Sequence, residues 1–133
     1  MADARFAPSL DDIEALAQAA WAELPAEFRT LAGDVIFRIE DFADEEVLAE
    51  IGIEDPFALS GLYHGVDLTR RSVSDPAPAA PMVFLYRRAL LDEWIERGDI
   101  ALADLVAHVL VHEVGHHFGF SDEQMDEILD QTD

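Results

Sequence analysis

The sequence contains no cysteine and no lysine. Without cysteine the chain can form neither a disulfide nor a cysteine-ligated metal site, so any metal must be held by histidine or carboxylate side chains. All 8 of its cationic residues are arginine. The sequence has 29 acidic residues, so its formal net charge is −21. Nucleic acids and anionic membranes are both negatively charged and bind proteins with cationic surfaces. We therefore expect neither as a partner, and we interpret most of the charge as a solvated surface.

Long hydrophobic runs are also missing. No stretch reaches the roughly 18 apolar residues that a membrane-spanning helix needs. The start, MADARFAPSLDDIEAL, lacks the basic and then apolar segments of a secretory signal, so a cytoplasmic location is the default expectation. A length of 133 residues with 50% apolar content suits one domain with a modest core. We expect residues 1–133 to form that domain, with 1–8 flexible and the proline-rich segment 72–81 forming a loop.

Helical spacing of apolar residues is found in several segments. Ser9 is a candidate N-cap residue for the first, and Ser121 for the last, where Gln124 occupies the capping-box position. The predicted helices are residues 9–22, 44–52 (closed by Gly52), the stretch through LLDEWIERG that stops at Gly98, 100–118, and 121 to about 130.

Strand patterns are shorter. VIFRIE (35–40) alternates with period two, and ALSGLYHGVDL (58–68) is a weaker strand in which Gly61 and Gly65 suggest a bulge or a close backbone approach. MVFLYRRALL starts as a strand, and Met82–Phe84 could be an edge strand that holds a substrate by β-augmentation. The fold class predicted is α+β, a small mixed sheet of about three strands packed with helices.

The histidines are concentrated in VLVHEVGHHFGFSD, residues 109–122, which holds three of the five. His112 and His116 are four residues apart, so they share one face of the predicted helix, about 6 Å apart along its axis. Two imidazoles placed in this way can bind one metal ion. With Glu113 they form H-E-x-x-H, the metalloprotease signature of two ligands and a glutamate general base.

The pattern extends to H-E-x-x-H-x-x-G-x-x-D, which is far rarer by chance. Gly119 can adopt a positive φ, end the helix and turn the chain back. That turn can bring Asp122 to the metal as a third ligand, leaving one position open as in a catalytic zinc site. The competing interpretation of Asp122 is a carboxylate at a helix start, favoured there by the helix dipole. For His112, Glu113 and His116 the competing interpretation is a polar face on a surface helix.

Zinc chemistry follows from this arrangement. A zinc ion acidifies its bound water and polarises a scissile carbonyl, and Glu113 would accept the water's proton and pass it to the leaving amine. The predicted function is a zinc-dependent hydrolase, most simply a metallopeptidase. The alternative is a non-catalytic scaffold that binds metal weakly or holds a basic protein partner. Glu113 favours catalysis, because a structural metal site is closed and has no use for a base.

Residues 112–122 resemble the zincin superfamily, in the variant whose third ligand is aspartate. GLYHGVDLTRRS, VFLYRRALL and VHEVGHHFGFSDEQM resemble a small bacterial family of zincin-like metallopeptidases, over about residues 25–130. The resemblance implies a minimal zincin fold with the active-site helix near the C-terminus. It also implies a peptide or protein substrate, Glu113 as the base, and one zinc ion held by His112, His116 and Asp122. Larger zincins with the extended motif have a downstream methionine turn. Eleven residues follow Asp122, and we do not expect Met125 to form that turn.

Two further histidines lie near the motif. His108 is one turn before His112 and could extend the histidine stripe, although a satisfied core histidine is commoner at such a position. His117 is about 100° around the helix from His116, so it cannot easily share the ligand geometry. We expect it beside the site or exposed.

Other polar residues lie near the predicted strands. Tyr63, His64 and Tyr86 are candidates for stabilising the tetrahedral oxyanion, although packing in the sheet is the commoner role for such residues. Arg70 and Arg71 could bind a substrate carboxylate, or pair with acidic residues of the chain itself.

Overall fold

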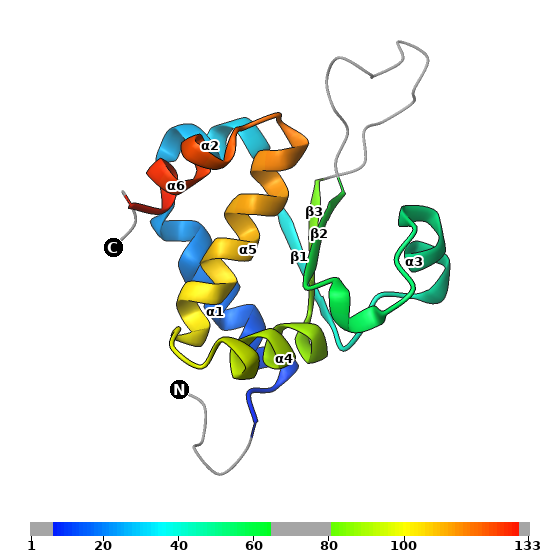
Figure 1. Cartoon of the computed structure of the whole chain (residues 1–133). Coiled ribbons are helices and arrows are strands. Elements are labelled where there is room, and N and C mark those ends of the chain that lie inside the picture. The colour runs from blue at the N-terminus through cyan, green and yellow to red at the C-terminus, as the bar shows by residue number, and fades with distance from the viewer. Residues whose placement is uncertain (1–6, 65–80, 131–133) are drawn as a thin grey trace.

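A computed structural model describes residues 7–64 and 81–130. Its helices and one small sheet confirm the predicted α+β class (Figure 1). Residues 1–6, Gly65, Arg70, Arg71 and segment 72–80 lie outside the described residues, so the expectations for them stay predictions. The elements are α1 (Leu10–Glu23), α2 (Ala26–Ala32), β1 (Ile36–Glu40), α3 (Glu45–Ile51), the 3-10 helix η1 (Pro56–Ala58), β2 (Gly61–His64), β3 (Met82–Tyr86), α4 (Arg87–Arg97), α5 (Leu102–His117) and α6 (Asp122–Asp130).

The sheet is mixed and has the order β1-β3-β2 in the described part of the chain. Strand β3 pairs in parallel with β1 and antiparallel with β2, so it lies in the centre. The prediction that Met82–Phe84 forms an edge strand is therefore wrong. The near-continuous apolar run of β3 is typical of a strand covered on both faces. Its Val83 and Leu85 are both 0% exposed.

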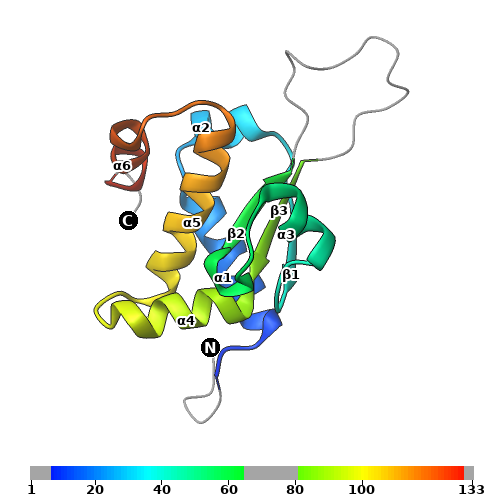
Figure 2. The same ribbon diagram turned by 45° about the vertical axis from the view of Figure 1, so that its right-hand side comes forward.

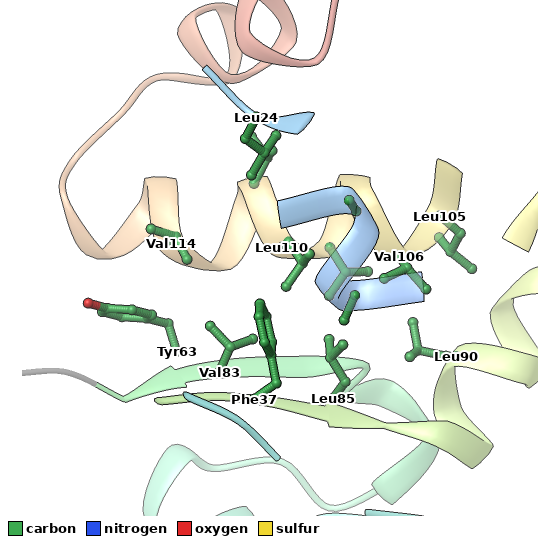
Figure 3. Close-up of a cluster of buried hydrophobic side chains, with 14 of the residues drawn as sticks. Leu24, Phe37, Tyr63, Val83, Leu85, Leu90, Leu105, Val106, Leu110 and Val114 are labelled. Carbon is green, nitrogen blue, oxygen red and sulfur yellow. The ribbon is translucent and has the colours of Figure 1, made fainter. Parts of the chain in front are cut away.

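Helices cover both faces of this sheet. Helices α1 and α5 pack on one face, whereas α3 lies on the opposite side (Figures 1 and 2). The side chains of Phe37, Val83 and Leu85 point from the sheet toward α5 (Figure 3). Opposite them, α5 contributes a row of apolar side chains, of which Figure 3 labels Leu105, Val106, Leu110 and Val114. One side of α5 is thus committed to the core, and its polar residues must lie elsewhere. No helix in the described part of the chain is long and apolar enough to cross a membrane.

Two capping boxes define where α1 and α6 begin, which confirms the predicted caps Ser9 and Ser121 and the predicted box at Gln124. The Ser9 hydroxyl accepts a hydrogen bond from the Asp12 N–H at 3.1 Å, and the Asp12 carboxylate accepts one from the Ser9 N–H at 2.8 Å. Ser121 and Gln124 repeat the arrangement at 3.1 and 2.8 Å. Each box satisfies backbone donors that a helix N-terminus leaves without intrahelical partners.

Helix α2 was not predicted. It has only seven residues, too few to show helical periodicity, and it lies between Pro25 and Gly33. Its buried Phe28 packs 6.0 Å from the ring of Trp21 and 5.8 Å from the ring of Phe120, measured between centroids. These contacts with residues near and far in the sequence stabilise a helix that would be marginal alone.

Candidate metal centre

The site is built on the side of α5 that does not enter the core. His108, His112 and His116 repeat at four-residue intervals, so they form a stripe along one face of the helix. The rings of His112 and His116 have centroids 5.8 Å apart. Next to this stripe, Gly115 contacts α6 and Glu113 contacts β2, so the two histidines lie between these elements.

A tight turn links α5 to α6. The N–H of Phe120 donates to the carbonyl oxygen of Gly115 at 2.8 Å, and the N–H of Gly119 donates to that of His116 at 3.1 Å. This pair of bonds is a Schellman motif, and it requires the left-handed residue that Gly119 supplies with φ of +80°. The predicted role of Gly119 in ending the helix is confirmed. The turn reverses the chain so that α6 starts beside the end of α5.

The turn brings three motif residues together. One ligand atom each from His112, His116 and Asp122 lies within 4.8 Å of the other two. The Nε2 atom of His112 is buried and has no hydrogen-bond partner among the described residues. A buried polar atom in a folded protein normally has a partner, and a metal ion would provide one here. Two imidazole nitrogens with a carboxylate oxygen form a donor set that zinc prefers, so these residues fit the ion.

Glu113 occupies the same turn of α5 as His112 but faces strand β2. Burial raises the pKa of its carboxyl group, while the nearby His116 and a hydrogen bond from the backbone N–H of Tyr63 act in the opposite direction. A partly buried carboxylate with a raised pKa is a better proton acceptor near neutral pH than a fully exposed one. Tyr63 also fixes where this carboxylate lies. Sequence reasoning did not find this backbone contact.

Strand β2 reaches Glu113 because Gly61 lets it approach α5 closely. A Cβ atom at Gly61 would lie 2.7 Å from Cγ1 of Val109, well inside van der Waals contact. Val109 lies one turn before Glu113 on the helix. The predicted close backbone approach at Gly61 is therefore confirmed, and its effect is to place Tyr63 beside the site.

The three side chains proposed for the oxyanion lie in different surroundings. The ring of Tyr63 is buried against His117 and Phe118, with centroids 4.6 and 6.0 Å away. Tyr86 is 1% exposed in a second apolar cluster, where burial and then nearby carboxylates raise its pKa to about 12. His64 is exposed at the end of β2. None of the three belongs to the metal-ligand group, and an oxyanion role for them stays a prediction.

The two neighbouring histidines do not join the metal-ligand group either. The ring of His108 stacks on that of His112, with centroids 4.1 Å apart. His117 is partly buried, and its Nε2 atom has no hydrogen-bond partner in the described part of the chain. Its contact with Tyr63 places it beside the site, which is one of the two locations expected for it.

An α+β fold in which one helix presents H-E-x-x-H between a strand and a third acidic residue is characteristic of the zincin class of metallopeptidases. A family model described as zincin-like metallopeptidase matches residues 32–131, a range that runs from the end of α2 to α6. The chain therefore belongs to the family of zincin-like metallopeptidases. No curated protein matches the chain. Membership of this family implies a zinc cofactor, for which the group of His112, His116 and Asp122 is a possible site.

Proposed function

We propose that the protein is a zinc-dependent metallopeptidase that uses Glu113 as its general base. The observation that carries this function is the convergence of three ligand atoms, from α5 and α6, within 4.8 Å of one another, next to the partly buried carboxylate of Glu113 on α5. In our proposal His112, His116 and Asp122 hold the ion. Three protein ligands leave one coordination position open, as catalysis requires and a structural site does not.

The residues of the chain divide the work of hydrolysis. A zinc ion bound here supplies an acidified water and polarises the scissile carbonyl. Glu113 accepts the proton of the attacking water and delivers it to the leaving amine. The N–H of Tyr63 holds the Glu113 carboxylate in place. Burial of the Glu113 carboxyl group favours this proton transfer, because burial makes the ionised form less stable relative to the protonated form.

Metal binding is the first test. Calorimetric titration of the metal-free protein with zinc should give one ion per chain, and His116→Ala should abolish binding. Asp122→Ala should weaken it by at least the roughly 10–100-fold typical of residues that support metal ligands. Unchanged affinity in Asp122→Ala would leave this residue as a helix-start carboxylate only. If the folded wild type does not bind zinc, the proposed function is wrong.

Hydrolysis is the second test, with a library of internally quenched fluorescent peptides as the probe. The zinc-loaded wild type should cleave members of the library, a chelator should stop cleavage, and added zinc should restore it. Glu113→Gln should bind zinc normally yet cleave about 10²–10⁴-fold more slowly, the usual contribution of a general base. Full activity in that variant would eliminate Glu113 as the base. Tight zinc binding without any cleavage would favour the non-catalytic scaffold.

A further inference from the structure

Helix α6 determines where the third candidate ligand lies. Asp122 is the first residue of this helix, which runs beside the C-terminal half of α5 (Figures 1 and 2). The turn and the capping box settle where α6 begins, but they act only at its first residues. The distance of the whole helix from α5 must be set by side chains. Of the nine residues of α6, all described by the structure, only Met125 is buried.

Met125 packs directly on the backbone of α5. A Cβ atom at Gly115 would lie 2.6 Å from the Sδ atom of Met125 and 2.9 Å from its Cγ atom, distances that real contacts do not reach. Met125 is 0% exposed, so its side chain has no solvent-filled space into which it could move. Glycine is a poor residue for a helix interior, and here its missing side chain is the space that methionine fills. A flexible thioether suits such an irregular gap.

We propose that Met125 is a positioning residue for Asp122. Packed on the bare backbone of Gly115, its side chain fixes how closely α6 approaches α5 and thereby holds the carboxylate near the two histidines. Met125 is one turn after Asp122 on the same helix, so a shift or tilt of α6 at Met125 moves the carboxylate as well. This role depends on the zinc site proposed above.

Three variants test the contact by zinc affinity, measured by competition with a chromophoric chelator. Met125→Ala removes the spacer, and Gly115→Ala forces the helices apart. Each should weaken zinc binding about tenfold, the lower end of the range for residues that orient metal ligands. Met125→Leu conserves volume and should bind zinc within about threefold of wild type. Equal affinity in wild type, Met125→Ala and Gly115→Ala would overturn the proposal while leaving the zinc site intact.

A double-variant cycle separates positioning from general loosening of the fold. If Met125 acts through Asp122, Met125→Ala should cause no further loss of zinc affinity in an Asp122→Ala background. The same loss in both backgrounds would overturn the proposal. Leu48→Ala is the matched control, because Leu48 is a buried residue of the other apolar cluster. It should destabilise the fold without changing zinc affinity.

A structural readout needs no metal. In a crystal structure of metal-free Gly115→Ala, the Asp122 carboxylate should lie farther from His116 than in a wild-type crystal. An α6 in its wild-type position would overturn the proposal, whatever the wild type binds. If the carboxylate moves but wild type binds no zinc, Met125 sets the position of α6 without serving a metal site, and the proposed metallopeptidase function fails.

Discussion

The imidazole rings of His108 and His112 are stacked, with 4.1 Å between their centroids and 23° between their planes. Burial lowers the pKa of His108, and the neighbouring His112 adds to the effect, so the structure favours the neutral form of the His108 ring. A neutral ring can restrain the orientation of His112 without placing a positive charge next to a cation. Groups that orient a metal-binding histidine commonly raise its affinity for the metal.

The first prediction concerns this stack. His108→Ala should weaken zinc binding about tenfold, because His112 loses the ring that orients it. His108→Phe keeps a flat ring without ligand atoms, so it should bind zinc nearly as well as wild type. Chelator competition measures both affinities. A loss in the phenylalanine variant as large as in the alanine variant would instead identify His108 as a ligand.

The second prediction concerns the burial of Glu113 in the metal-free protein. Its pKa in the folded state is raised above the ordinary value of 4.5, so the folded state favours the protonated form. This contribution to stability is present below the unfolded pKa and is lost as the pH rises through the folded pKa. Glu113→Gln should therefore unfold at higher urea concentration than wild type at pH 7, and the difference should shrink as the pH approaches 4.5.

The exposed Glu127 supplies the control for that experiment. Glu127→Gln removes one negative charge from the exposed surface of α6 and so controls for the change in net charge alone. A gain in Glu113→Gln that stayed constant between pH 7 and 4.5 would contradict an origin in the buried charge.

The third prediction concerns Gly61. Gly61→Ala places a Cβ atom 2.7 Å from Val109 Cγ1, and overpacking of this kind costs about 1–3 kcal/mol of unfolding free energy. Urea titration measures the loss. Because Val109→Ala removes the clashing methyl group, the double variant should be more stable than the sum of the two single losses predicts. Strict additivity would show that β2 does not press on α5 at this point.

The fourth prediction concerns Gly119, whose φ is +80° and whose surroundings are open, with nothing within 4 Å of an added Cβ. Gly119→Ala should cost roughly 1–2 kcal/mol, from left-handed backbone strain alone. Gly119→Asn should cost less, because asparagine tolerates this conformation at helix ends. Thermal or urea unfolding gives the order. A larger loss for asparagine than for alanine would indicate a steric rather than a conformational cause.

Local signals made much of this fold predictable. The capping boxes at Ser9 and Ser121 lie within four consecutive residues each, and the periodic pattern of α5 extends over sixteen. The motif at 112–122 is equally local. Its residues are brought together by a helix and one turn, both of which depend on short-range spacing. The structure therefore places His112, His116 and Asp122 where the spacing predicted, close enough to share a metal ion.

Contacts distant in sequence were not predictable in the same way. The central position of β3 depends on its pairing with β1 and β2. The sequence MVFLY does not indicate which strands it pairs with. Helix α2 depends on the rings of Trp21 and Phe120. The glycine inside the motif, Gly115, was a usable signal, because a glycine in a helix interior often marks a close neighbour. Its partner Met125 required the structure.

The turn at Gly119 has a consequence for the order in which the site can form. The three candidate ligands lie within residues 112–122, whereas the hydrogen bond that orients Glu113 comes from Tyr63 in a separate strand. Short loops close faster than long ones and at lower entropic cost. A nascent chain can thus bring its three candidate ligands together before its sheet is complete, and Glu113 reaches its final position only when β2 joins. Assembly of the candidate ligand group and placement of Glu113 are therefore separable events in folding.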